Sequence, residues 1–304
     1  MANLKTWAKA LRMPFFTATL VPILLGSVLA WHQTQQFHWG LFFITLFAGI
    51  FLHAGTNLSN DYFDHKSGND EANTTPTMFS GGSRVIQKNE IPANQILMAA
   101  LLFFAAGLAL GLYLNFLLPG NTILWIGIAG ILLGFFYTAK PFRLGYNGLG
   151  ELAVAIGFGP LTVMAAYFVQ AQTFTLQSFL VSLPVGILIG LVLFINEFPD
   201  YEADKKVKKN TWVVLLGKQK AAKAYLLGVA AVYVIIALGI LLNWFTGFAL
   251  AVFATIPLAV KALQTLIAHF DRIEELLPAN QTTIMLHLIT GLLLTLSFLA
   301  DGLP

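Results

Sequence analysis

Charged residues are distributed unevenly along this chain, and the gaps between them predict its architecture. Five long stretches contain no Asp, Glu, Lys or Arg: residues 13–60, 91–139, 152–196, 224–260 and 276–300. A helix needs about 20 predominantly apolar residues to cross the ~30 Å hydrocarbon core of a bilayer. Each of the first four stretches is long enough for two crossings joined by a short turn, and the last is long enough for one. The pattern therefore predicts nine transmembrane helices.

The expected spans are 14–31, 39–58, 94–114, 121–139, 152–169, 179–197, 224–242, 246–264 and 283–301. Hydrophobic residues make up 57% of the chain and charged residues 10%, with a mean hydropathy of +0.75, whereas a soluble domain has about 25% charged residues. There is no cysteine, which excludes disulfides, Fe–S clusters and thiolate metal sites. No polar segment is long enough for a soluble domain. We therefore expect residues 1–304 to form a single all-α membrane domain, with the nine helices in one bundle.

The basic residues predict the orientation of this bundle. All 17 Lys and Arg residues fall on one side of the expected membrane, in the N-terminal segment and in the loops 61–90, 140–151, 197–223 and 261–275. By the positive-inside rule, that side is cytoplasmic. An odd number of spans then places the N-terminus inside and the C-terminus outside. The chain is expected to be a multi-pass protein of the bacterial inner or plasma membrane.

A polar motif follows the second expected span. Asn57, Asp61 and Asp64 are spaced i, i+4 and i+7, which places an amide and two carboxylates on one face of a helix end. Carboxylate and amide oxygens, without Cys or paired His, point to a hard cation, and Mg²⁺ in particular often shares its ligands between protein carboxylates and substrate phosphates. The alternative for this motif alone is a solvated helix cap, since Asn and Asp favour helix ends.

A second motif of the same kind follows the sixth expected span. Asn196, Asp200 and Asp204 are spaced i, i+4 and i+8, again on one helix face. Polar groups at the membrane boundary are costly and are typical of functional sites. If the two motifs face each other, they could hold two Mg²⁺ ions on either side of one pyrophosphate, with the site facing the cytoplasm.

Basic residues near the motifs could complete an anion site. Arg84 follows the loop 80–83, whose sequence Ser-Gly-Gly-Ser could offer backbone N–H groups to phosphate. Lys140 and Arg143 lie in the connection after the fourth expected span. Arg would bind phosphate as a bidentate fork and Lys as a point charge. The alternative for Lys140 and Arg143 is that they only orient the chain in the membrane.

Other polar residues receive different interpretations. Lys205, Lys206, Lys208 and Lys209 form a polybasic run next to the membrane, which we expect to contact anionic lipid. His53 lies inside the second span and could face a pocket. The favoured interpretation of His53 is a hydrogen-bonded structural residue, because a buried polar group needs a partner.

Together these motifs resemble the UbiA superfamily of intramembrane prenyltransferases, over nearly the whole chain. The most specific pieces are 57–70, 196–217 and the segment from Tyr137-Thr138 to Gly148-Leu149-Gly150-Glu151. The last piece, with the Arg84 loop, is most similar to the menaquinone branch, which prenylates 1,4-dihydroxy-2-naphthoate. The first motif departs from the family's Asp-x-x-x-Asp pattern at His65 and Gly68, so the resemblance assigns no role to Asp70.

The resemblance implies a Mg²⁺-dependent prenyltransferase. Its metal ligands would be Asn57, Asp61, Asp64, Asn196, Asp200 and Asp204, or most of them. These residues would hold a polyprenyl pyrophosphate, bound also by Tyr137, Arg84, Lys140 and Arg143. The four carboxylates and the three cations would form the catalytic set, because they stabilise the departing pyrophosphate. An aromatic acceptor would attack the allylic carbocation that remains. Aromatic side chains would shield that cation, and the tail would lie between helices. The expected partners are the two substrates and the bilayer, with no nucleic acid.

Alternatives stay open at this stage. A transferase of the same superfamily with a hydroxybenzoate, a porphyrin or a lipid alcohol as acceptor would keep the same pyrophosphate site, and so would a prenyl-pyrophosphate cyclase. A transporter is a more distant alternative. Transporters typically place their charges near the bilayer midplane on discontinuous helices, whereas here the charges cluster at one face.

Overall fold

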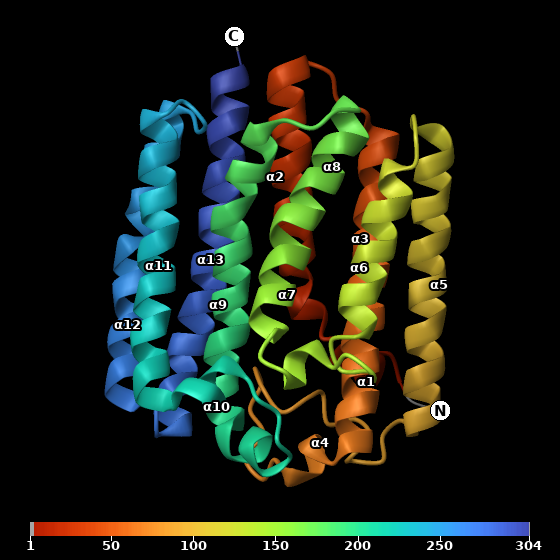
Figure 1. Ribbon diagram of the computed structural model, residues 1–304, viewed down its shortest axis with the longest axis vertical. Coiled ribbons are helices and arrows are strands. Elements are labelled where there is room, and N and C mark those ends of the chain that lie inside the picture. The colour runs from red at the N-terminus through yellow and green to blue at the C-terminus, as the bar shows by residue number, and fades with distance from the viewer. Residues whose placement is uncertain (1–2, 304) are drawn as a thin grey trace.

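Long helices run roughly side by side in the computed structural model, which describes residues 3–303 (Figure 1). The α-helices are α1 (Leu4–Ala10), α2 (Thr17–Thr34), α3 (Trp39–Ser67), α4 (Asn69–Ala72), α5 (Ala93–Leu117), α6 (Thr122–Phe135), α7 (Gly150–Ile156), α8 (Thr162–Ala171), α9 (Leu176–Lys206), α10 (Trp212–Leu216), α11 (Lys218–Leu241), α12 (Ile256–His269) and α13 (Ile273–Gly302). Short 3-10 or π segments are η1 (Met13–Phe16), η2 (Leu144–Tyr146), η3 (Gly157–Leu161) and η4 (Gly247–Thr255). The described residues form no β-strand, so the all-α prediction is confirmed.

Within the described residues, 8 helical segments are long and apolar enough to cross a membrane. They are 13–34, α3, α5, 150–171, α9, α11, 247–269 and α13. The expected fourth span, 121–139, corresponds to α6, an apolar helix of 14 residues. At 1.5 Å per residue, α6 rises about 21 Å, which is shorter than the ~30 Å hydrocarbon core. The ninth crossing therefore stays a prediction.

The helices α3 and α9 extend well past their expected ends at 58 and 197. The first continues to Ser67 and stops where Gly68 adopts a left-handed conformation (φ 77°) and returns its N–H to the Asp64 carbonyl, a common helix ending. The second continues to Lys206. Both polar motifs thus lie on rigid helix rather than in loops. Figure 1 places these two helix ends beside α4 and α10, at the end of the molecule opposite the C-terminus.

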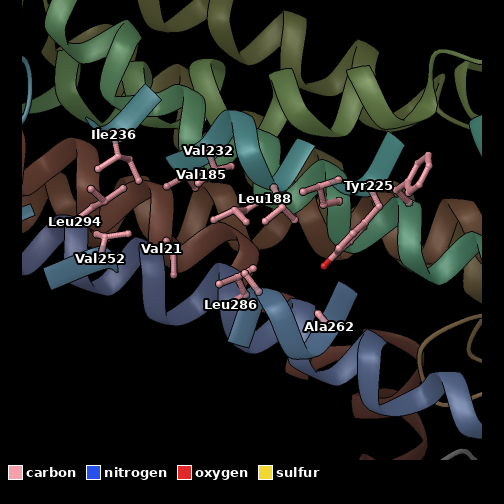
Figure 2. Close-up of a cluster of buried hydrophobic side chains, with 14 of the residues drawn as sticks. Val21, Val185, Leu188, Tyr225, Val232, Ile236, Val252, Ala262, Leu286 and Leu294 are labelled. Carbon is pink, nitrogen blue, oxygen red and sulfur yellow. The ribbon is translucent and has the colours of Figure 1, made fainter. Parts of the chain in front are cut away.

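The largest hydrophobic core lies among α2, α9, α11, α12 and α13. Figure 2 shows part of it, where Val21, Val185 and Leu286 come from three different helices. Each of these side chains is at most 1% exposed. Tight packing on this side of the bundle fixes α2 and α9, which also form one wall of the site described below.

The segment from α7 to α8 is interrupted at η3, a π-helical turn that contains Pro160. Proline lacks a backbone N–H and its ring clashes with the preceding turn, which explains the local widening. Here the chain also approaches α9 closely, because a Cβ on Gly159 would lie 2.5 Å from the Gly186 Cα. Small residues allow such contacts between membrane helices. This approach places Val154 and Phe158 beside α9 in the wall of the site.

Candidate active site

The two polar motifs face a common cavity of about 180 Å³, which we call the polar chamber. It lies between α3 and α9, and the loop that follows α4 lines one side of it. Its charged and amide lining residues are Arg12, Asn57, Asn60, Asp64, Asn69, Asp70, Asn196, Glu197, Asp200, Asp204 and Lys209. Five of the six predicted metal ligands are among them. The sixth, Asp61, lies behind this lining and is 2% exposed.

A lysine joins the two motifs. Lys209 Nζ lies 3.4 Å from Asp64 Oδ2 and 3.7 Å from Asp204 Oδ1, and its side chain is 12% exposed. The prediction that Lys209 contacts lipid is therefore wrong. The chain reverses at Lys208, which has a φ of 58°, and the Lys209 N–H donates to the Asp204 carbonyl at 2.8 Å. This turn directs Lys209 inward, whereas Lys208 remains exposed.

The charges around Lys209 favour its protonated form. Burial alone would lower the pKa of Lys209, but the Asp204 and Asp64 carboxylates outweigh burial and raise that pKa well above its ordinary value. Lys209 is therefore a fixed positive charge between the two motifs.

Arg12 supplies a second cation to the chamber. Its guanidinium pairs with the Asp61 carboxylate, which also accepts hydrogen bonds from the Ser83 hydroxyl and, at 3.2 Å, from the Ser83 N–H. Sequence reasoning missed Arg12 as a site residue. The one available signal was its place directly before the first span, which is equally typical of a residue that only orients the chain.

The loop after α4 binds the second motif. Asn73 Nδ2 donates to Asp200 Oδ1 at 2.7 Å, and the Gly81 N–H donates to Asp200 Oδ2 at 3.0 Å. From α4 itself, Asn69 Nδ2 donates to Asp204 Oδ1 at 2.8 Å. The loop 80–83 was predicted to offer N–H groups to phosphate, but here the N–H groups of Gly81 and Ser83 bind carboxylates. These bonds fix the spacing between α3 and α9.

Glycine is required at one point of this loop. Gly82 has a φ of 73°, a left-handed conformation, and a Cβ at this position would lie 2.8 Å from Asp70 Oδ2. The loop can therefore lie directly against the Asp70 carboxylate.

The three predicted phosphate-binding cations surround the chamber without lining it. The Arg84 guanidinium donates to the Asp70 carbonyl, and Lys140 is exposed. The Arg143 guanidinium carbon lies 3.5 Å from the Tyr146 ring centroid, and the Tyr146 hydroxyl donates to Asp64 Oδ1 at 2.6 Å. In this arrangement Arg84 and Arg143 support chamber residues. Their predicted contact with pyrophosphate stays a prediction, as does that of Lys140.

The two motif asparagines line the chamber and are also tied to neighbouring segments. Asn57 Nδ2 donates to the Leu11 carbonyl at 3.0 Å, which holds the N-terminal segment against α3. Asn196 Oδ1 accepts a hydrogen bond from Asn280 Nδ2 on α13 at 2.8 Å. A hydrogen bond thus fixes one polar atom of each side-chain amide. The other polar atom of that amide can therefore adopt only a limited set of orientations.

Buried acids outnumber the cations here. Asp64, Asp70 and Asp204 are between 1% and 6% exposed. Burial, together with the Asp64 and Asp61 carboxylates, raises the pKa of the Asp70 carboxyl to about 8. Glu197 also lines the chamber and has one buried oxygen without a hydrogen-bond partner among the described residues. Such a surplus of acidic oxygens favours the binding of an additional cation.

An apolar cavity of about 190 Å³, the apolar chamber, lies deeper in the bundle among α2, α3, α5, α6, α7 and α8. It shares five lining residues with the polar chamber: His53, Thr56, Tyr137, Val154 and Phe158. We call these five residues the junction. The two chambers together could hold a molecule with an anionic head and a hydrocarbon tail.

Such paired chambers inside a bundle of apolar helices are typical of a membrane enzyme that acts on an amphiphilic substrate. The chain belongs to the UbiA prenyltransferase family, whose sequence pattern matches residues 19–276. The family predicted from the motifs is thus confirmed, and the chain is a prenyltransferase and an integral multi-pass membrane protein.

Named relatives cover most of this chain. A 2-carboxy-1,4-naphthoquinone phytyltransferase from Synechocystis sp. is 33% identical over 303 residues, which is 99% of this chain and 95% of the relative. A 1,4-dihydroxy-2-naphthoate octaprenyltransferase from Bacillus subtilis is 29% identical over 93% of this chain and 88% of its own length.

Solved structures share the fold at low sequence identity. A UbiA homolog from Aeropyrum pernix K1 aligns with a TM-score of 0.68 and 14% identity, over 95% of this chain and 98% of that chain. A UbiA homolog from Archaeoglobus fulgidus, solved with DMAPP and Mg²⁺, aligns with a TM-score of 0.65 and 16% identity, over 95% and 99% of the two chains.

Proposed function

We propose that this prenyltransferase moves a polyprenyl group from polyprenyl pyrophosphate to an aromatic acceptor in quinone biosynthesis, with 1,4-dihydroxy-2-naphthoate as the acceptor. The observation that carries the proposal is that the polar and apolar chambers adjoin each other and share the five junction residues. A pyrophosphate head would lie in the first and a prenyl tail in the second. The naphthoate and naphthoquinone substrates in the names of two relatives support the choice of acceptor.

The donor oxygens of the polar chamber suit Mg²⁺. The proposed ligands are the chamber residues Asn57, Asp64, Asn196, Asp200 and Asp204, together with Asp61, which lies outside the chamber lining and pairs with Arg12. Among the described residues, no three Asp, Glu or His side chains are grouped closely enough to hold a metal ion by themselves. Mg²⁺ usually takes only one or two protein carboxylates and completes its shell with water and substrate phosphate, so this arrangement suits an ion that arrives with pyrophosphate. Bound there, it would neutralise charge on the leaving group.

The residues of the chain itself provide the remaining electrostatic stabilisation. Arg12 and Lys209 are the cations that line the polar chamber, and both are held in place by buried carboxylates. We propose that they bind the pyrophosphate and stabilise its charge as the allylic C–O bond breaks. Phe15 and Phe158 line the same chamber, where they can exclude water and attract an allylic cation through their ring faces.

We further propose that the chain is one domain, 1–304, that crosses the bacterial inner membrane nine times. The cytoplasmic side would hold the N-terminus and the active site, and the C-terminus would lie outside. All 17 basic residues lie on the proposed inner side. The positions of the two termini at opposite ends of the molecule support an odd number of crossings (Figure 1).

Single cysteines are expected to report this topology, because the chain contains none of its own. Glu202→Cys lies at the chamber end and Thr173→Cys at the opposite end, and both native side chains are exposed. In intact cells, a membrane-impermeant maleimide should label Thr173→Cys, and it should label Glu202→Cys only after permeabilisation. Labelling of Glu202→Cys in intact cells would contradict the proposed orientation.

The activity itself is tested with purified protein in lipid vesicles. With Mg²⁺ and geranylgeranyl pyrophosphate, we expect mass spectrometry to show a prenylated product from 1,4-dihydroxy-2-naphthoate, and no such product in EDTA. Parallel reactions contain 4-hydroxybenzoate, a porphyrin or a lipid alcohol. A product from one of these acceptors alone would replace the proposed acceptor, and a cyclised hydrocarbon formed without any acceptor would indicate a cyclase.

A further inference from the structure

His53 occupies the boundary between the two chambers. It is four residues before Asn57 on α3, so it lies about one turn, or roughly 6 Å, further into the bundle on the same helix face. It lines both chambers and is 8% exposed. The face that carries the metal motif therefore continues into the membrane with an imidazole ring.

Neighbouring side chains fix this ring. His53 Nδ1 lies 2.8 Å from the Thr19 hydroxyl on α2. Phe16 and Phe158 contact the ring at an angle, with centroid distances of 5.3 Å and 4.8 Å and interplanar angles of 61° and 63°. An aromatic ring held on two sides and by one hydrogen bond has a defined orientation.

The second ring nitrogen remains available. Among residues 3–303, the hydrogen bond of the His53 ring is made at Nδ1, and none is made at Nε2. Nε2 is also absent from the fully buried polar atoms that lack a partner, so it keeps some accessible surface in a residue that lines both chambers. The Thr19 hydroxyl can donate to Nδ1 or accept from it, so Nε2 can present either an N–H or a lone pair. In either state Nε2 can bind a hydroxyl group, because a hydroxyl can donate or accept a hydrogen bond.

The position of the reacting carbon points to the partner of Nε2. With the pyrophosphate between the motifs and the tail in the apolar chamber, the carbon that joins them lies at the junction. The acceptor ring must reach that carbon. Of the other polar groups at the junction, Thr56 donates its hydroxyl to the Leu52 carbonyl at 2.9 Å, and the Tyr137 hydroxyl lies against Gly150.

We propose that His53 is an acceptor-binding residue, whose Nε2 hydrogen-bonds a ring hydroxyl of the aromatic acceptor at the junction. This inference rests on the proposed function. The hydrogen bond would orient the acceptor so that a ring carbon faces the allylic carbon of the donor, and Phe158 would provide an apolar surface for the ring. Thr19 would act as a positioning residue that holds the imidazole.

Two substitutions separate this role from a structural one. Asn in His53→Asn can keep the hydrogen bond to Thr19 but has no group at the position of Nε2, whereas Gln in His53→Gln can place an amide there. We expect His53→Asn to raise KM for the acceptor about tenfold, the scale of one lost hydrogen bond, and to leave KM for prenyl pyrophosphate unchanged. His53→Gln should restore most of the acceptor affinity.

His287→Asn is the matched control. His287 is likewise buried in a long helix, α13, at 1% exposure, but it lines neither chamber. This variant should leave both KM values unchanged. An acceptor analogue without ring hydroxyls, used as a competitive inhibitor, should bind the wild type about tenfold more weakly than the dihydroxy form, and this difference should disappear in His53→Asn.

The outcomes are distinguishable. A wild-type protein that prenylates no aromatic acceptor would refute the proposed function, and the inference with it. A wild-type protein that prenylates the acceptor, with an unchanged acceptor KM in His53→Asn, would refute only the role of His53. Equal increases in the KM values of donor and acceptor would also refute it, since they indicate a general distortion of the site.

Discussion

Replacing Asp200 by Asn is expected to lower turnover at least about a hundredfold, because a transition-state electrostatic contact contributes about 2.7–4 kcal/mol. The Asn side chain keeps one oxygen, which can accept from the Gly81 N–H, but its NH2 group cannot accept the hydrogen bond that Asn73 Nδ2 donates to Asp200, and it carries no charge to share with Mg²⁺. Asp200 forms no ion pair among the described residues, so its loss leaves no buried cation unpaired. The melting temperature should therefore stay close to that of the wild type.

Asp301→Asn is the control for this variant. Asp301 lies near the C-terminus, at the end of the molecule away from the polar chamber, and its side chain is 41% exposed. The turnover of Asp301→Asn should match that of the wild type in the same assay. Near-normal turnover of Asp200→Asn, or full wild-type activity in EDTA, would contradict the proposed pyrophosphate–Mg²⁺ site.

The other motif carboxylates are less suitable for this test. If the carboxylates of Asp61, Asp64, Asp200 and Asp204 had only one another as neighbours, removing any of them would relieve repulsion and leave the fold intact. In the structure, Asp61 pairs with Arg12, while Asp64 and Asp204 flank Lys209. Breaking a buried ion pair costs about 3–5 kcal/mol when one charge stays behind. Loss of activity in those three variants would therefore combine catalytic and folding effects.

Lys209→Met is expected to have a comparably large effect. Methionine approximates the length of the lysine stem but leaves Asp64 and Asp204 facing each other without a cation. We expect the free energy of unfolding to fall by about 3–5 kcal/mol, the cost of a broken buried pair, and the melting temperature to fall with it. Turnover at saturating acceptor should be reduced by at least about a hundredfold. High Mg²⁺ should recover part of the stability, because it supplies positive charge to the same carboxylates.

Lys208→Met provides the control one residue away, since Lys208 is exposed. It should behave like the wild type in both measurements. If Lys208→Met and Lys209→Met were equally mild, the placement of Lys209 between the motifs would have no functional meaning. Alanine variants of Arg84, Lys140 and Arg143 in this assay test whether those residues bind pyrophosphate, as the sequence predicted.

Local patterns in the sequence determined the membrane bundle and the two motif faces. Long stretches without charge can only be buried in lipid or in other apolar helices, so 13–60 and 152–196 predict spans whatever their partners are. In the same way, a spacing of four residues places Asn57 and Asp61 on one helix face through backbone geometry alone. Hydropathy does not specify where a turn lies. It therefore predicted neither that α3 and α9 end later than expected nor that α6 is short.

Only the tertiary structure decided which charges meet. Arg12 and Asp61 are 49 positions apart, and Lys209 and Asp64 are 145 apart. Nothing in the spacing distinguishes Lys209 from Lys208, yet one turn of the chain buries the first and exposes the second. The sequence indicated only that His53 could face a pocket, and the packing of α2 and α7 decided that Thr19 and the junction lie beside it. Such contacts depend on how helices pack over long sequence separations, and local residue patterns do not encode that packing.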